Sequence, residues 1–299
     1  SEDGRLAWNA TDEQGVTSVY VWDAAQVTHV TDTRSMDTPN LFWLPNGDLI
    51  WTILSPRLDL RENTSLWLWD GEQSFNLAQP SENGIWMTLW GEGQLAFTAG
   101  TWDESQLYIW TDVDAVPIST IQNGRLMYLS GSDQGQLAWI AERNSQQELM
   151  MWDGTNTRSL TPIAHADQFP RWSSDGRLAW SARTESGQQH IYLWDGQNIS
   201  DISPDADYSF APFWLPDGRL AWQSDGYPGN ELKFWDRGRI GTITTGVGPI
   251  RDVRVFLAGL VWTQEIDGNS DVFFWDTTQT INVSADPGWD GLALVPPMG

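Results

Sequence analysis

One phrase recurs seven times along the 299 residues, and it constrains the fold more than any other feature of the sequence. It runs Gly-x-Leu-Ala-Trp, then about nine variable residues, then an apolar segment that ends in Trp-Asp. The first half of the phrase ends at Trp8, Trp51, Phe97, Trp139, Trp180, Trp222 and Trp262. The second half ends at Trp22, Trp69, Trp110, Trp152, Trp194, Trp235 and Trp275. A period of 40 to 47 residues that fills the chain indicates a repeat architecture.

Each repeat is expected to form four short strands, because apolar residues alternate at period two and turn residues separate the segments. The fifth repeat shows this most clearly, with expected strands at 169–173, 177–181, 190–194 and 198–202. Its last two strands are joined through Asp195-Gly196, a pair typical of tight hairpin turns. Four-stranded antiparallel units at this period predict a β-propeller, and the period-two pattern excludes a helical solenoid.

The sequence therefore predicts an all-β fold, a single domain over residues 1–299 that forms a seven-bladed β-propeller of four-stranded antiparallel blades. The chain opens at the second strand of a repeat, Gly4 to Trp8, and closes with Leu292–Pro296, which resembles the first strand that this repeat lacks. We expect these two segments to pair in one blade, which would close the ring and remove two sheet edges. Because the first residue is Ser1, we also expect a mature or excised fragment.

The stretch Phe169-Pro170-Arg171-Trp172-Ser173-Ser174-Asp175-Gly176-Arg177-Leu178-Ala179-Trp180, with Ile191-Tyr192-Leu193-Trp194-Asp195 after it, resembles the repeat of TolB-type and WD-repeat-like bacterial propellers. The stretches 211–218 and 267–273 fit the same repeat, so the resemblance covers the whole chain. It implies the propeller fold. For function it implies a range, from periplasmic scaffolds and cell-surface sensors to the gating propellers of oligopeptidases.

Charge and composition exclude several classes of partner. The formal net charge is −24, with a single lysine and no basic stripe, so the chain would repel nucleic acid. Cysteine is absent, which excludes disulfides and thiolate chemistry. No run of about 18 apolar residues is present, so direct membrane insertion is not expected. The acidity suits an exported protein or a protein from a salty habitat.

Sequence motifs for catalysis and metal binding are missing. There is no His-Glu-x-x-His motif, no Gly-x-Ser-x-Gly elbow and no phosphate-binding loop, so the sequence predicts that the chain is not an enzyme and holds no cofactor. His165 next to Asp167 falls short of the three or four ligands that a metal needs, so no metal site is predicted. His190 opens a strand and is expected at the surface.

Tryptophans provide the expected core rather than a sugar-binding surface. Sixteen of the 21 fall in repeat positions, where a large flat ring fills the space between neighbouring blades. Trp102 instead lies in a polar loop, at 99–105, and is the aromatic residue most suited to a role outside the core.

The longer and more variable loops should all lie on one face of the propeller, so we expect a binding site there and at the mouth of the channel. Acidic residues of these loops could ring the mouth and attract a cation or a basic peptide; they are Asp37, Glu82, Asp167, Asp207 and Asp286. The alternative is that they cap turns. A second group, Arg57, Asp59 and Arg61, sits in a long loop that could equally be a solvated loop. The remaining candidates are Trp102, His165, Tyr208, Tyr227 and Trp289.

These observations predict a non-enzymatic, extracytoplasmic binding or scaffold module that holds a protein or peptide partner on its long-loop face. The alternative is a lectin-like or glycan-cleaving propeller, in which exposed aromatic residues would line sugar pockets. A third possibility is a passive spacer within a larger surface protein.

Overall fold

The computed structural model describes residues 1–33, 40–56, 62–82, 84–101, 103–162, 170–206, 208–224, 231–245, 248–256, 259–266, 268–284, 288 and 290–291. In this described part the chain forms β-strands and contains no helix. No helix long and apolar enough to cross a membrane is therefore found among these residues. The chain divides into two compact units, unit 1 at Ser1–Pro162 and unit 2 at Ile163–Gly299. Each unit is described by itself.

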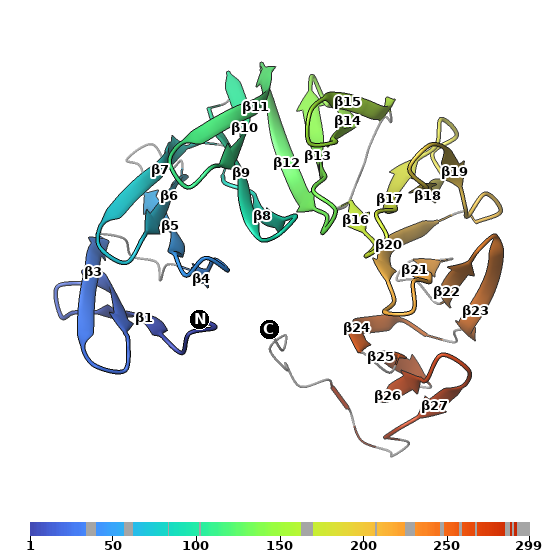
Figure 1. Ribbon diagram of the computed structural model, residues 1–299. Coiled ribbons are helices and arrows are strands. Elements are labelled where there is room, and N and C mark those ends of the chain that lie inside the picture. Colours follow the sequence, from blue (N-terminus) through green and yellow to red (C-terminus); the bar gives the residue numbers. More distant parts are fainter. Residues whose placement is uncertain are drawn as a thin grey trace. The chain divides into compact units, whose positions relative to one another are not determined.

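The described strands of unit 1 form four antiparallel sheets (Figure 1). Sheet 1 contains β1 (Leu6–Thr11), β2 (Thr17–Trp22) and β3 (Val27–Thr33). Sheet 2 contains β4 (Leu41–Trp43), β5 (Leu49–Pro56), β6 (Glu62–Trp69) and β7 (Ser74–Ser81). Sheet 3 contains β8 (Met87–Trp90), β9 (Gln94–Gly100), β10 (Glu104–Trp110) and β11 (Ala115–Gln122). Sheet 4 contains β12 (Gly124–Gly131), β13 (Leu137–Arg143), β14 (Gln146–Trp152) and β15 (Thr157–Pro162).

Unit 2 continues with three four-stranded sheets in its described part. Sheet 5 contains β16 (Arg171–Trp172), β17 (Leu178–Arg183), β18 (Gln189–Trp194) and β19 (Ile199–Asp201). Sheet 6 contains β20 (Ser209–Trp214), β21 (Leu220–Ser224), β22 (Glu231–Asp236) and β23 (Arg239–Thr245). Sheet 7 contains β24 (Ile250–Phe256), β25 (Gly259–Ile266), β26 (Asn269–Trp275) and β27 (Thr280–Asn282).

Seven sheets of consecutive antiparallel strands confirm the predicted all-β propeller fold and its seven repeats. Sheet 1 has three strands, as expected for a repeat that begins at its second strand. The register repeats as well: in sheets 1, 2, 4, 5, 6 and 7 the leucine of the repeated phrase pairs with the tryptophan that ends the next strand, as in Leu178↔Trp194 and Leu220↔Trp235. The expected closing strand Leu292–Pro296 lies outside the described residues.

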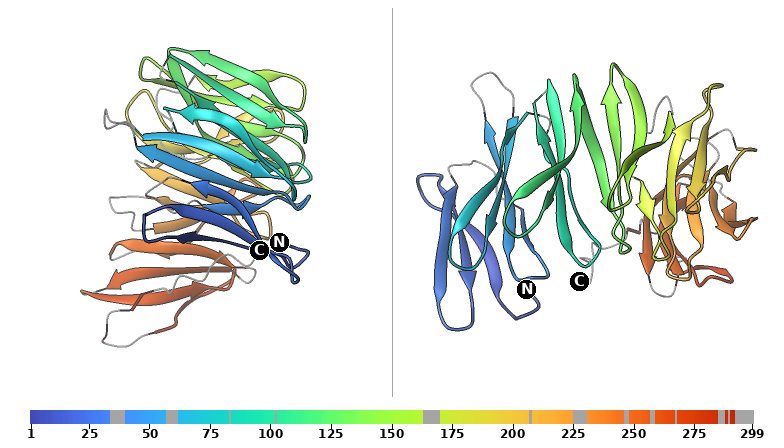
Figure 2. Two further views of the ribbon diagram at one scale, coloured as in Figure 1. Left: turned by 90° about the vertical axis from the view of Figure 1, so that its left-hand side faces the viewer. Right: turned by 45° about the horizontal axis from the view of Figure 1, so that its top comes forward.

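Tryptophans form the core between neighbouring sheets, as predicted. The second-strand residues Trp51, Trp139, Trp180, Trp222 and Trp262 are 0% exposed, and so is Phe97 in the same slot. Within unit 1, Trp51 packs with Val19 and Val21 of sheet 1, so this ring fills the gap to the preceding sheet. Figure 2 shows the sheets of unit 1 side by side from two directions.

Sheet 1 departs from this pattern. Trp8 is 38% exposed and Trp22 is 37% exposed, although their counterparts in the other sheets are buried or nearly so. Sheet 1 is the first sheet of unit 1, so no preceding sheet of that unit covers this face. The exposure thus has a local topological cause and does not by itself mark a ligand site.

The turns between third and fourth strands are held by aspartate side chains. Asp195 Oδ1 accepts hydrogen bonds from the backbone N–H groups of Gln197 (2.9 Å) and Asn198 (2.7 Å). The same pair of bonds recurs at Asp23, Asp70, Asp153 and Asp276. The loop spans four residues, and the residue after the aspartate has the positive φ, as at Gly196 (103°) and Thr277 (78°). The turn is therefore longer than the tight hairpin that the Asp-Gly pair predicted.

The outer strands of the sheets are poor templates for strand addition. In sheets 1, 2, 3, 4 and 6 the pairing of the outermost strand shifts register at the same place, at Tyr20, Trp67, Tyr108, Met150 and Lys233. In sheets 5 and 7 the outermost strand has three residues. Bulges and short edge strands both discourage pairing with another chain. A partner is therefore better sought between sheets than along their outer edges.

Candidate functional site

Most residues predicted to form the binding site fall outside the described residues. This holds for Asp37, Arg57, Asp59, Arg61, Trp102, His165, Asp167, Asp207, Tyr227, Asp286 and Trp289. Tyr208 is described: it lies just before β20, half-buried, with its ring centroid 5.3 Å from that of Phe210. Its ring packs on Phe210 of sheet 6, and its backbone forms a bridge to Gln189 of sheet 5. The twelve residues thus remain a prediction as a site, and the described part of the chain must be searched independently.

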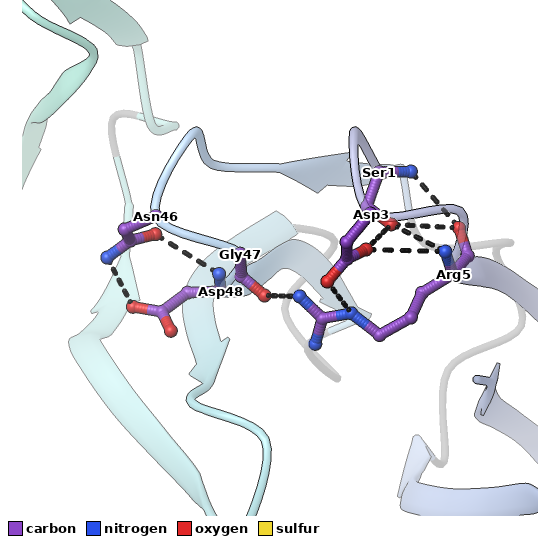
Figure 3. Close-up of polar contacts among 6 residues, drawn as sticks. All are labelled: Ser1, Asp3, Arg5, Asn46, Gly47 and Asp48. Carbon is purple, nitrogen blue, oxygen red and sulfur yellow. Dashed lines mark hydrogen bonds and ion pairs between the residues drawn. The ribbon is translucent and has the colours of Figure 1, made fainter.

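The first feature of that part is an arginine that ties one sheet to the next (Figure 3). The Arg5 guanidinium donates a hydrogen bond from Nη2 to the carbonyl oxygen of Gly47 (2.6 Å), in the first turn of sheet 2. Asp3 holds the same guanidinium through Nε (2.7 Å). The group also lies 4.6 Å above the Trp43 ring. This arrangement ties sheet 1 to sheet 2 and engages two of the five N–H donors of the guanidinium.

The same contact recurs in unit 2, where the sequence again reads Asp-Gly-Arg. Arg177 donates to the Gly218 carbonyl (2.9 Å) and lies 4.5 Å above the Trp214 ring. Its hydrogen bond lowers the pKa of Asp175, its partner in the turn. Arg219 lies 4.7 Å above the Trp275 ring and donates to the Thr277 carbonyl (3.4 Å). Sequence reasoning noted these turns but missed the arginines, although the repeated tripeptide was a readable signal.

Sheet 2 carries Asp48 where these sheets carry arginine. Its backbone N–H donates to Asn46 Oδ1 (3.1 Å), and the Asn46 amide donates to Asp48 Oδ2 (2.9 Å), as Figure 3 shows. Partial burial raises the pKa of Asp48, and the nearby Asp112 and Asp70 carboxylates raise it further. The turn face therefore becomes more negative toward sheet 3.

The second feature is a half-open groove between sheets 2 and 3, called here the β7–β10 groove. Its volume is about 570 Å³. Sheet 2 contributes only apolar residues to it, and sheet 3 contributes the polar wall together with two alanines; the lining residues are Leu77, Ala78, Ala99, Gly100, Thr101, Glu104, Gln106, Tyr108 and Ala115. β7 lies beside β9, which brings the two walls together (Figure 1). A volume of 300–1,000 Å³ is usual for ligand pockets.

The polar wall holds a carboxylate in a fixed position. The Gln106 side-chain amide donates to Glu104 Oε1 (2.7 Å), and the Gln122 amide donates to Glu104 Oε2 (2.5 Å). The Tyr108 hydroxyl in turn donates to Gln106 Oε1. A carboxylate offers about four acceptor positions, and these amides occupy two of them. Glu104 can therefore accept further hydrogen bonds from a group in the groove.

Tyr108 is the aromatic member of the groove. One face of its ring stacks on Phe97, with centroids 5.2 Å apart and planes 16° apart. Burial raises the pKa of its hydroxyl, and the Glu104 charge raises it further. The hydroxyl therefore stays protonated and keeps donating to Gln106. The ring and the chain of hydrogen bonds together order the polar wall before any ligand arrives.

The end of the groove is closed where sheets 2 and 3 exchange hydrogen bonds. The Ser81 hydroxyl donates to the Gly100 carbonyl (3.0 Å) and accepts from the Gly100 N–H (3.0 Å). The Glu82 N–H also donates to the Gly100 carbonyl (2.9 Å). A Cβ at Gly100 would lie 2.2 Å from the Glu104 carbonyl oxygen, so this position needs glycine. These contacts lie beside the 99–105 loop that contains Trp102.

The segment of the sequence that contains Glu104 has no basic residue. Between Glu62 and Gly124 the sequence has no Lys, Arg or His, and it has nine acidic residues: Glu62, Asp70, Glu72, Glu82, Glu92, Asp103, Glu104, Asp112 and Asp114. Among the described residues, no cation pairs with Glu104. The groove is thus an acceptor-rich site within a strongly negative segment, and this cation-free run is the sequence signal that could have located it.

A second groove of about 450 Å³ lies between sheets 5 and 6, lined in part by Asp201, Ile202 and Trp235. Asp201 Oδ2 is 2.6 Å from His190 Nδ1. The His190 side chain is 5% exposed, so the prediction of a surface histidine is wrong. His190 is buried because its strand lies between two others and Asp201 satisfies one ring nitrogen. Within the described residues, no three His, Asp or Glu side chains converge as metal ligands would.

Comparison with known proteins supports the fold. No family model matches the sequence, and no curated protein is significantly similar to it. Among solved structures, the β-propeller domain of the Trilobed protease from Pyrococcus furiosus is similar over 96% of this chain and 94% of that one, with 13% identity and a TM-score of 0.51. TolB from Acinetobacter baumannii is similar over 91% of this chain and 77% of that one, with 13% identity and a TM-score of 0.46.

In fold, the chain is a β-propeller. The acylaminoacyl peptidase of Pyrococcus horikoshii is also similar, with 14% identity and a TM-score of 0.48 over 90% of this chain. The match covers 48% of that peptidase, so this chain spans about half its length. At such identities the likeness concerns the fold alone.

The prediction that the chain is not an enzyme is wrong. A similar propeller occurs as a domain of the Trilobed protease, so this fold is found in an enzyme, and missing motifs in a propeller do not exclude catalysis. The fold by itself does not show an activity either.

Proposed function

We propose that this β-propeller binds a protein or peptide partner, and that a side chain of the partner enters the β7–β10 groove. The half-open groove is the observation that carries the proposal. Its volume of about 570 Å³ accommodates a large side chain, and its open side allows that side chain to remain attached to a polypeptide. The polar wall is already ordered, which reduces the entropy lost on binding.

Two further observations support this mode of binding. Bulged or very short outer strands disfavour strand addition at the edges of the sheets. The groove also adjoins the connection between β9 and β10, residues 101–103, on the face where the sequence predicts a partner. The candidates Asp37, Asp167, Asp207 and Asp286 would extend the same negative field and remain predictions, as does the role of Trp102.

The proposal includes an extracytoplasmic location. The formal net charge of −24 and the absence of cysteine are compatible with an exported protein. Immunodetection in cell fractions of the source organism tests this part: we expect the protein in the envelope or medium, and recovery with the cytoplasmic fraction would contradict it.

The binding proposal is tested by selecting peptides from a random displayed library on the immobilised protein and measuring their affinity by calorimetry. Thr101 is exposed at the edge of the groove, so the larger side chain of Thr101→Trp should obstruct the entrance. The affinity for the selected peptides should then fall by at least about tenfold. Val113→Trp is the matched control, because Val113 is 77% exposed in a turn of the same sheet and does not line the groove. Equal affinity for native protein and Thr101→Trp would overturn the proposal.

A further inference from the structure

We propose that the group which enters the β7–β10 groove is the guanidinium of an arginine side chain, paired with Glu104. This inference rests on the proposed function and adds the chemical class of the partner group. It is carried by the fixed carboxylate, by the composition of the two walls and by the charge of the surrounding segment.

The carboxylate is ordered but not neutralised. Its two hydrogen-bond donors, the amides of Gln106 and Gln122, carry no charge, so the negative charge of Glu104 persists in the groove. The acceptor positions that remain suit a donor with several N–H groups. Guanidinium provides five N–H donors in a rigid fork that matches carboxylate geometry.

The walls match the rest of an arginine side chain. Leu77 and Ala78 of sheet 2 and Ala115 of sheet 3 supply apolar surface to the groove. Arginine has an aliphatic stem that packs on apolar surface while its head remains among polar groups. The Tyr108 ring lies within the same groove and offers a π surface to a cation. A neutral polar ligand would gain less here, because the groove presents mainly acceptors.

The field around the groove favours a cation over an anion or a neutral group. The segment from Glu62 to Gly124 carries nine acidic residues and no basic residue. A negative field of this kind raises the local concentration of cations and speeds their association, more strongly at low salt. Charge complementarity therefore selects the class of partner before the contacts in the groove form.

The test uses two probes, the peptide acetyl-Ala-Arg-Ala-amide and the same peptide with citrulline in place of arginine. Citrulline has the same length but carries a neutral urea oxygen where arginine has one terminal nitrogen of the guanidinium. The protein has six tyrosines, so 3-fluorotyrosine labelling gives few fluorine resonances, and Tyr108→Phe assigns that of Tyr108. We expect the arginine peptide to shift the Tyr108 resonance saturably, with the citrulline peptide binding about tenfold more weakly.

Glu104→Gln removes the charge and keeps the shape, so it should weaken the arginine peptide about tenfold. Glu72→Gln makes the same change in net charge at an exposed turn outside the groove and should leave its affinity unchanged. The resonances of the other five tyrosines report whether Glu104→Gln keeps its fold. Equal binding of the two peptides, native-like affinity in Glu104→Gln, or an unmoved Tyr108 resonance would each overturn the inference.

The two proposals fail differently. Library-selected peptides that lose affinity in Thr101→Trp but bind Glu104→Gln as tightly as the native protein would overturn the arginine inference and leave groove binding intact. Selected peptides that bind Thr101→Trp as tightly as the native protein would overturn the proposed function, whatever the affinity of the arginine peptide.

Discussion

The arginine that ties sheet 5 to sheet 6 provides a sharp test of how the propeller is stabilised. Arg177 is 18% exposed, donates to the Gly218 carbonyl at 2.9 Å and lies over the Trp214 ring at 4.5 Å. A hydrogen bond from a charged donor contributes about 1.5 kcal/mol, and a half-exposed cation–π contact contributes about 0.5–1 kcal/mol. The pair with the largely exposed Asp175 adds at most about 0.5 kcal/mol. We therefore expect Arg177→Ala to cost about 2–3 kcal/mol.

Urea unfolding followed by tryptophan fluorescence measures this cost. With a slope near 2–3 kcal/mol per molar urea, the midpoint should fall by about 1 M. Arg177→Lys keeps the charge but lacks the planar fork, so its midpoint should lie between those of the native protein and Arg177→Ala. Arg251→Ala is the matched control, because Arg251 is exposed on β24 of the same unit and should cost no more than about 0.5 kcal/mol. A midpoint for Arg177→Ala that equals that of Arg251→Ala would refute the reasoning.

Two further predictions concern the turns and the close approach of strands. Hydrogen bonds from the Thr278 hydroxyl and from the backbone N–H groups of Gln279 and Thr278 lower the pKa of Asp276 from 3.8 to about 2. The stabilisation that the ionised Asp276 side chain gives the folded state is thus fully present above about pH 4 and is lost as pH falls through about 2. The difference in urea midpoint between the native protein and Asp276→Ala should therefore shrink over that range. A constant difference would contradict this prediction. Gly259 has φ of 146°, and a Cβ there would lie 1.9 Å from the Trp275 carbonyl oxygen. Gly259→Ala should therefore cost at least about 2 kcal/mol by thermal or urea unfolding, clearly more than Gly196→Ala, whose added Cβ meets nothing within 4 Å; equal costs would contradict the steric argument.

The repeat made most of the fold predictable. A leucine and a tryptophan recur at fixed spacing, and burial of the indole between sheets needs that spacing in each repeat, so strand order and core positions follow from sequence. The contacts of Arg177 and Arg219 were less accessible, because their acceptors lie 41 and 58 residues away and depend on how neighbouring sheets pack. His190 was misplaced for a similar reason: its partner Asp201 lies on the next strand, where the register and not the local sequence brings them together.

The binding site was less predictable because the search was directed at loops. Long loops and exposed aromatic residues suggested Asp37, Trp102 and Asp167, which fall outside the described residues. The β7–β10 groove is instead lined largely by strand residues of two sheets. The residues that line the groove are separated in the sequence and come together only in the folded sheets, so no local sequence motif predicts it. The absence of basic residues from Glu62 to Gly124 was visible in the sequence, but it marks a site only once a cavity is found within that segment.

The position of the groove follows from a departure from the repeat. The third repeat ends its first half with Phe97, whereas the other six end theirs with tryptophan. This slot packs toward the preceding sheet, as Trp51 does against sheet 1. In sheet 3 the smaller phenyl ring is buried and stacks on Tyr108, whose hydroxyl reaches Gln106 and orders the polar wall. The same stack forms where the slot holds tryptophan, as between Trp180 and Tyr192 (5.9 Å between centroids, 19° between planes), so Phe97 differs from its counterparts in size and not in arrangement. Because a phenyl ring is smaller than an indole, Phe97 fills less of the space toward sheet 2, where the groove lies.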